Sequence, residues 1–248
     1  MTATLGTVDL RLGDRLRALT LSVHAGEVTA ICGPNGAGKS TLLSCLAGLV
    51  APDAGLVAMG GRLLRNVSAQ ERARCIGYLP QSPEVAWDVT VEVLVSLGRL
   101  PWGDREADDG KAAVEEAITA MDLAALRRRP VTRLSGGERA RALMGRVLAT
   151  RPVWLLADEP LANLDLSHGL SLMGRFREQA RAGRGVILVL HDLATAMNYA
   201  DRVIVLENGR LAADGEPEHA LSARNIERVW GCPARWLGDR GARALSLG

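Results

Sequence analysis

Eight consecutive residues early in the chain have the spacing of a loop that binds phosphate groups. They fit Gly-x4-Gly-Lys-Ser, follow the apolar run 28–32 and precede leucines at helical spacing, which is the context that the motif requires. Glycines let backbone amides point inward at a phosphate, and a helix N-terminus adds partial positive charge. The predicted loop contains Gly33, Pro34, Asn35, Gly36, Ala37, Gly38, Lys39 and Ser40, and Thr41 follows it as a further nucleotide-binding residue.

An acidic pair at the end of a second apolar run supplies the other half of such a site. Residues 153–157 are apolar and lead directly into Asp158 and Glu159. Lys39 should reach the β- and γ-phosphates of ATP, while Ser40 and Asp158 should hold Mg²⁺. Glu159 is placed to polarise an attacking water as a general base. An isolated Asp-Glu pair is usually a solvated turn, but this pair follows a predicted buried strand.

Composition and charge narrow the classes of function. The 248 residues are 48% hydrophobic but include just five Trp, two Tyr and one Phe, so the core is built mainly from aliphatic side chains. The net charge of +2, with both signs mixed along the chain, gives no footprint for nucleic acid, and we expect no such partner. The densest basic run, residues 127–129, is typical of a solvated helix end.

Cysteine spacing and apolar run lengths give two further expectations. The four cysteines show no metal-ligand spacing and no disulfide framework, so we expect reduced thiols. No signal peptide opens the chain, and the longest apolar runs, 153–157 and 186–190, are far shorter than the ~20 residues of a membrane helix. We therefore expect a protein that is soluble by itself and reaches a membrane through a partner.

The apolar pattern predicts an α/β fold with a mainly parallel sheet. Continuous apolar strands that alternate with helices are typical of such sheets, and Asn208-Gly209 indicates a hairpin. The predicted strands are 7–12, 19–23, 28–31, 76–79, 153–157, 186–190, 203–206 and 210–213, with further short strands up to about residue 65. The predicted helices start after residue 39 and cover 91–98, 112–121, 136–150 and 167–182.

Composition shifts along the chain suggest how this single domain, residues 1–248, is organised. Residues 1–80 and 136–215 are predicted to form the α/β core, which includes an N-terminal β element. Residues 81–135 have mostly helical patterns and are predicted to form an inserted helical subdomain. Residues 216–248 are predicted to add a C-terminal accessory element.

Six motifs in order make the chain resemble an ATP-binding cassette (ABC) ATPase, a P-loop fold, over nearly its whole length. Ser135-Gly136-Gly137 alone would more often be a loop, although Ser135 is a good helix N-cap. Alone, Gln81 would be a surface amide and His191 a capping histidine. The motifs are the Walker A loop 33–40, the Q-loop Gln81, the signature 134–138, the Walker B pair Asp158 and Glu159, the D-loop 161–165 and the switch His191.

The resemblance implies a mechanism that uses ATP, Mg²⁺ and two copies of the chain. The two copies would face head to tail, so that Ser135, Gly136 and Gly137 of one copy cover the ATP on the other. Glu159 would activate water and His191 would sense the γ-phosphate. Gln81 would help to hold Mg²⁺ and link the γ-phosphate to the helical subdomain, and Asp165 of the D-loop would contribute to nucleotide binding.

Two positions depart from the family pattern. Residues 1–33 contain no aromatic residue, although the family usually stacks adenine on one before Walker A. Leu12 stands roughly at that place, and we expect contact from Leu or Arg to replace the stacking. Arg139 follows the signature glutamate, where many members have Gln that would contact ribose across the dimer.

Residues 97–102, Leu-Gly-Arg-Leu-Pro-Trp, indicate the branch of the family. They resemble the Leu-Gly-Arg-x-Pro region of ATPases that drive uptake of iron-siderophore, haem and cobalamin. Ser167-His168 and the tail 229–237 resemble the same branch, although the tail is equally well explained as a packing appendage. Trp87 and Trp102 are candidate contacts with a permease or, alternatively, core residues.

This resemblance implies the ATPase subunit of a metal-chelate importer at the cytoplasmic face of the inner (plasma) membrane. Its partners would be a second copy, two transmembrane permease subunits and, indirectly, an extracytoplasmic substrate-binding protein. An exporter or lipid-handling subunit would share all six motifs but would not need the 97–102 pattern. A soluble cassette ATPase acting on ribosomes or DNA would be expected to carry tandem cassettes or a coiled-coil insertion and a more basic surface.

Overall fold

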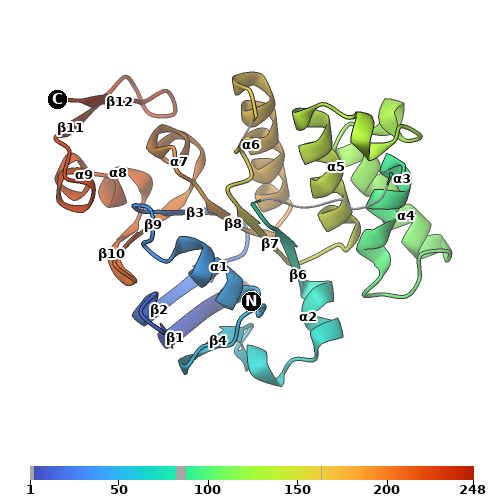
Figure 1. Cartoon of the computed structure of the whole chain (residues 1–248), viewed down its shortest axis with the longest axis horizontal. Helices are drawn as coiled ribbons and strands as arrows, with labels where there is room; N and C mark the ends of the chain where they lie inside the picture. Colours follow the sequence, from blue (N-terminus) through green and yellow to red (C-terminus); the bar gives the residue numbers. More distant parts are fainter. Residues whose placement is uncertain (1–2, 82–87, 163) are drawn as a thin grey trace.

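A central sheet of six strands organises the computed structural model, which describes residues 3–81, 88–162 and 164–248 (Figure 1). Its strands are β3 (Val28–Cys32), β6 (Ile76–Leu79), β7 (Trp154–Asp158), β8 (Gly185–Val189), β9 (Arg202–Glu207) and β10 (Arg210–Gly215). They lie in the order β10-β9-β3-β8-β7-β6, and all neighbours are parallel except β10 and β9. Every residue of β3, β7 and β8 is buried because both faces of the sheet are covered.

A second, antiparallel sheet lies beside the first and holds the helix that follows the phosphate loop. It contains β1 (Thr4–Leu12), β2 (Leu16–His24), β4 (Ala54–Met59) and β5 (Arg62–Leu63), in the order β2-β1-β4-β5. Helix α1 (Lys39–Leu46) lies between the two sheets and packs Leu42, Leu43 and Leu46 against residues of both. The loop before α1 is therefore fixed from two sides.

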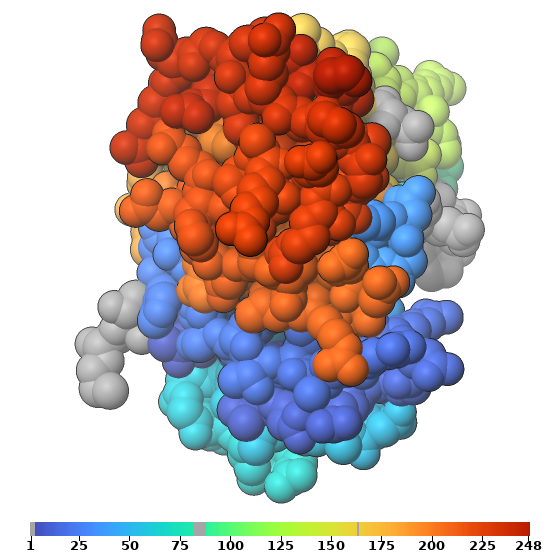
Figure 2. Space-filling model, turned by 90° about the vertical axis from the view of Figure 1, so that its left-hand side faces the viewer, coloured from blue at the N-terminus to red at the C-terminus, as the bar shows by residue number. Residues whose placement is uncertain are grey.

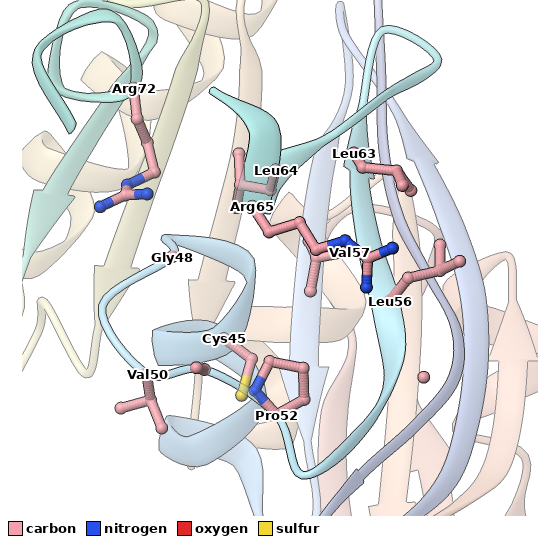
Figure 3. A pocket seen from close by; sticks show the side chains of 12 residues that line it. Cys45, Gly48, Val50, Pro52, Leu56, Val57, Leu63, Leu64, Arg65 and Arg72 are labelled. Atoms are coloured by element: carbon pink, nitrogen blue, oxygen red, sulfur yellow. The ribbon is translucent and has the colours of Figure 1, made fainter. Parts of the chain in front are cut away.

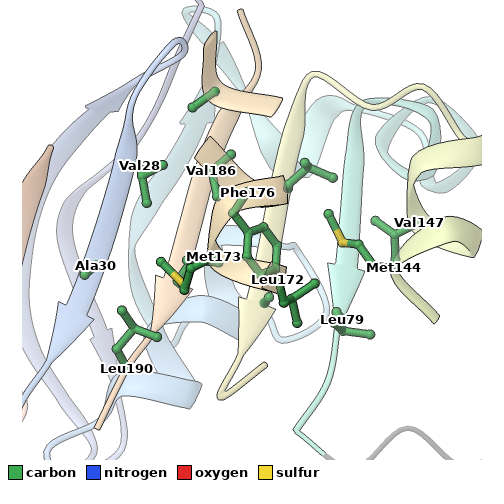
Figure 4. Close-up of a cluster of buried hydrophobic side chains, with 14 of the residues drawn as sticks. Val28, Ala30, Leu79, Met144, Val147, Leu172, Met173, Phe176, Val186 and Leu190 are labelled. Carbon is green, nitrogen blue, oxygen red and sulfur yellow. The ribbon is translucent and has the colours of Figure 1, made fainter. Parts of the chain in front are cut away.

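Helices cover the opposite face of the central sheet. Figure 4 shows Leu172, Met173 and Phe176 of α6 (Leu166–Arg181) packed near Val28 and Val186 of the sheet. Helix α7 (Leu193–Tyr199) continues this layer, and α5 (Gly136–Ala149) packs mainly against α3 (Val91–Ser96) and α4 (Asp108–Ala120). The division of the chain at residues 80, 135 and 215 stays a prediction, and by its contacts α5 lies with the helical group.

The predicted α/β fold, with its antiparallel N-terminal element and helical segments, is confirmed, although many element ends are shifted. Helix α2 (Ala69–Cys75) was not predicted, because it has no buried residue and so no apolar periodicity. The Ser68 hydroxyl caps this helix by accepting from the N–H of Glu71. Short 3-10 turns lie at η1 (Leu64–Asn66), η2 (Leu97–Arg99), η3 (Ala124–Leu126) and η4 (Val131–Arg133).

The C-terminal residues form two short helices and a hairpin, drawn in orange to red in Figure 2 above the N-terminal strands in blue. These are α8 (Pro217–Ala220), α9 (Ala223–Trp230), β11 (Ala234–Leu237) and β12 (Ala244–Leu247). The Trp236 indole N–H donates to the carbonyl of Leu221 at 2.7 Å, and Asn198 of α7 exchanges two hydrogen bonds with the backbone of Arg243. Within the described ranges, no helix has the length and apolarity needed to span a bilayer.

Candidate nucleotide site

The phosphate loop connects β3 to α1, and its glycines are required by backbone geometry. Gly36 and Gly38 have φ of 78° and 97°, in the left-handed region that favours glycine. A Cβ at Gly38 would lie 2.6 Å from the carbonyl oxygen of Arg15, and one at Gly33 would lie 2.2 Å from that of Leu206. The backbone at both positions is therefore pressed against neighbouring main chain, and a side chain at either would displace the loop.

Lys39 opens α1 and is almost fully buried under this loop. Its Nζ donates to the carbonyl oxygens of Gly33 at 2.8 Å and Pro34 at 2.9 Å. Burial lowers the pKa of Lys39, and the nearby Glu159 partly opposes that effect. The ammonium is thus held at the mouth of the loop, where it can bind an anion that replaces the two carbonyls.

Ser40 and Asp158 come together from two different segments. The Ser40 hydroxyl donates to Oδ1 of Asp158 at 3.0 Å. Burial raises the pKa of Asp158, and this hydrogen bond opposes the effect. One hydroxyl and one carboxylate are hard oxygen donors that fit Mg²⁺, which usually takes its remaining ligands from phosphates and water. Among the described residues there is no cluster of three or more His, Cys, Asp or Glu that could hold a metal by itself.

Glu159 is contacted by side chains from both neighbouring strand ends. Gln81, which follows β6, donates from Nε2 to Oε2 of Glu159 at 2.6 Å. His191, which follows β8, contacts the other carboxylate oxygen through Nε2. Glu159 itself follows β7 and has φ of 48°, which is uncommon for a residue other than glycine. The carboxylate is thus aimed from a strained turn and held by an amide and an imidazole.

Most of these residues line one cavity of about 580 Å³ at the carboxyl ends of the parallel strands, where ligands bind in open α/β sheets. Gly33, Pro34 and Asp158 are not among its described lining residues, although Asp158 accepts a hydrogen bond from Ser40, which is. Arg15 also lines it, and the sequence did not single out this residue. It lies in the turn between β1 and β2, and no local motif marks it. Leu12 is partly buried and packs against the N-terminal core, and its contact with adenine stays a prediction. The lining residues are Arg15, Asn35, Gly36, Ala37, Gly38, Lys39, Ser40, Thr41, Gln81, Glu159 and His191.

Ser135, Gly136, Gly137 and Asp165 are not among the described residues that line this cavity. They lie instead at the N-termini of two helices. The Ser135 hydroxyl and the Glu138 carboxylate each accept the other residue's backbone N–H, which forms a capping box for α5. Asp165 caps α6 by accepting from the N–H of His168. Within one chain, then, the sequence-predicted residues form two separate groups.

A different, apolar pocket of about 220 Å³ lies beside the C-terminal end of α1. Figure 3 shows Cys45, Pro52, Val57 and Leu64 among the side chains that line it. None of the described residues around it belongs to the sequence-predicted site, so this pocket is separate from the phosphate-binding cavity. Trp87, a candidate partner contact, lies outside the described residues, as does Asn163 of the D-loop.

Comparison with known proteins agrees with this geometry. The hemin import ATP-binding protein HmuV of Streptomyces coelicolor is 46% identical over 235 residues, covering 93% of this chain and 84% of that protein. The protein of the same name from Rhodococcus jostii is 44% identical, with 87% and 74% covered. The structure of cbiO1 from Clostridium perfringens matches with a TM-score of 0.78 at 27% identity, covering 90% of this chain and 92% of that one.

Exporters share the fold as well. A bacterial Atm1-family ABC exporter with ATP bound has a TM-score of 0.78 at 26% identity, covering 93% of this chain and 41% of the exporter. Residues 16–162, which run from the β2 strand through the phosphate loop to Glu159 and beyond, match the family described as ABC transporter. The chain therefore belongs to the ABC transporter family, as one of its ATPase domains.

Proposed function

We propose that this chain is the ATP-hydrolysing subunit of an importer whose cargo is haem, and that it works as a head-to-tail pair bound to two permease subunits. The observation that carries the ATPase part is the convergence of Lys39, Ser40 and Glu159 at one cavity, with Asp158 hydrogen-bonded to Ser40. The cargo is inferred from relatives that are named hemin import ATP-binding proteins.

Each residue at the cavity has a distinct role in the proposed hydrolysis of ATP. The loop amides and Lys39 bind the phosphates of ATP. Ser40 and Asp158 would hold Mg²⁺, with Gln81 nearby, and the ion supplies charge neutralisation to the phosphate oxygens. Glu159 orients the attacking water and accepts its proton, while Gln81 and His191 hold the carboxylate in place.

The second copy supplies what one chain lacks. Ser135, Gly136 and Gly137 lie outside their own chain's cavity, and Ser135 and Gly136 are exposed at the start of α5. In a head-to-tail pair this helix start would face the γ-phosphate bound to the other copy, and Asp165 would approach the same nucleotide. Closure on ATP and opening after hydrolysis then bias the permease between two states.

Sequence similarity to import proteins favours an importer over an exporter or a soluble ATPase. The fold does not distinguish importer from exporter, because an exporter has the same architecture. Membrane attachment through a permease, at the cytoplasmic face, follows from the proposal, as does an extracytoplasmic binding protein that selects the cargo. Reconstitution with the permease encoded in the same host should give ATP-dependent uptake of haem. Uptake of cobalamin or a ferric siderophore, and not of haem, would support the proposed importer function but contradict haem as its cargo.

Glu159→Gln tests the chemistry directly. We expect kcat for ATP hydrolysis to fall by at least about 100-fold, because the amide cannot accept the proton of the water. ATP binding should persist, and an ATP-dependent dimer should accumulate in size-exclusion chromatography. Glu106→Gln, at a highly exposed carboxylate, is the matched control. Hydrolysis at the normal rate by Glu159→Gln would show that another group is the base.

A further inference from the structure

His168 connects the two helix N-termini that the proposed dimer presents to its partner's nucleotide. We infer that His168 is a positioning residue that fixes the Asp165 turn to the Gly137 turn within one protomer, so that both move together during dimer closure. The inference rests on the proposed head-to-tail dimer. It rests on two contacts of one imidazole ring, a hydrogen bond on one side and close packing on the other.

The first contact ties the ring to the D-loop. His168 Nδ1 lies 2.8 Å and 2.7 Å from the two carboxylate oxygens of Asp165. The backbone N–H of His168 also donates to Asp165, at 2.8 Å. These bonds, the backbone one foremost, lower the pKa of Asp165 to about 2, so the carboxylate is ionised near neutral pH. An ionised carboxylate can only accept, and Nδ1 must therefore carry the proton that it donates.

The second contact ties the other edge of the ring to the signature segment. A Cβ built on Gly137 would lie 2.2 Å from Cδ2 of His168 and 2.9 Å from its Nε2. Gly137 lies in α5 and has no positive φ, so a side chain here would be opposed by the ring, which would have to shift, and not by the backbone conformation. The imidazole is thus seated directly on the backbone of the first turn of α5.

In the described part of the chain, few other contacts join the first turns of α5 and α6, so the His168 ring is a main connection between them. Helix α5 packs chiefly on α3 and α4, and its contact with α6 is slight by comparison. A cavity of about 250 Å³ opens between the first turns of α5 and α6, lined by Gly137, Leu164 and His168 among others. Because the two helix starts are not close-packed there, the imidazole is placed to transmit a displacement of one to the other.

Three variants separate the two contacts. His168→Phe keeps a ring over Gly137 but removes the donor to Asp165. His168→Asn keeps a donor near Asp165 but removes the ring, and His168→Ala removes both.

In a Glu159→Gln background, we expect His168→Ala to weaken ATP-dependent dimerisation by about 10-fold, with Phe and Asn each restoring part of it. With Glu159 intact, kcat should fall similarly while KM and monomer ATP affinity stay within about 2-fold. His24→Ala, at the exposed end of β2, is the matched control.

A double-mutant cycle supplies a readout that does not require dimers. Gly137→Ala should lower the melting temperature in the presence of His168, and His168→Ala should remove most of that loss. Additive losses would overturn the inference, as would a His168→Ala variant that dimerises and hydrolyses ATP like its parent. Failure of the Glu159→Gln parent to dimerise would instead contradict the proposed function, and the cycle would still decide whether the ring links the two turns.

Discussion

Lys39 is one of two lysines in a chain that otherwise uses arginine for its positive charge. Its compact ammonium fits between the carbonyl oxygens of Gly33 and Pro34, in a space closed by loop backbone. A planar guanidinium is wider and cannot occupy the same two hydrogen bonds. The choice of lysine at this position is therefore dictated by the size of the space as well as by the charge.

Lys39→Arg should accordingly fail to substitute for the native residue. We expect ATP affinity to fall by about 10-fold or more, because the longer fork is displaced from the loop mouth or forces the loop open. A titration with a fluorescent ATP analogue measures the change. Lys111→Arg, at the exposed second lysine, should bind like the native chain. Equal affinities for the two variants would show that charge alone suffices at position 39.

At the scale of elements, α5 is held at both ends by side chains. At its C-terminus, the carbonyl of Ala149 accepts from Arg99 at 3.0 Å and that of Thr150 accepts from Trp102 at 2.9 Å. The hydroxyl of Thr150 donates back to the carbonyl of Gly98 at 2.9 Å. The Leu-Gly-Arg-x-Pro segment thus caps the helix whose other end begins the signature motif.

Arg99→Ala should destabilise the protein by about 2–4 kcal/mol, since Arg99 is buried and also pairs with Asp104. The loss would be seen as a lower midpoint in urea denaturation. Arg128→Ala, at an exposed arginine between α4 and α5, should change the midpoint little. A midpoint for Arg99→Ala equal to that of Arg128→Ala would rule out a stabilising cap.

The same segment shows where sequence patterns stop being informative. Strands β3, β7 and β8 could be predicted because burial on both faces leaves continuous apolar runs, as at residues 154–157. That residues 97–102 cap α5 could not be predicted, because the contact joins residues about fifty positions apart. The position of Arg15 in the cavity lining could not be predicted for the same reason. The contacts of Gln81 and His191 with Glu159 also depend on the fold, because these residues follow three different strands that are neighbours in the sheet.

At the scale of the whole molecule, the central sheet separates two cores and carries the nucleotide cavity at one edge. The C-terminal hairpin packs on α7 and α9, away from the residues that line this cavity. Trp236 attaches it through the hydrogen bond to Leu221 and through contact with the larger core. The hairpin therefore contributes to stability without touching the site.

Trp236→Ala should lower the stability by about 2–3 kcal/mol, below the usual range for a fully buried Trp because this side chain is partly exposed. ATP affinity should stay within about 2-fold of the native value, since no residue of the hairpin lines the cavity in the described part of the chain. Calorimetry and nucleotide titration check the two halves. Leu237→Ala, at an exposed neighbour, is the control, and a large loss of ATP affinity in Trp236→Ala would link the hairpin to the site.

The left-handed backbone of Glu159 has a consequence for laboratory evolution. Holding a non-glycine residue at φ of 48° costs on the order of 1–3 kcal/mol, which glycine would avoid. A library selected for heat resistance alone should therefore enrich glycine at this position, whereas one selected for growth on the transported nutrient should retain glutamate. The two selections would therefore favour different residues at position 159. Sequencing each selected library and comparing the frequency of glycine at this position would measure the difference.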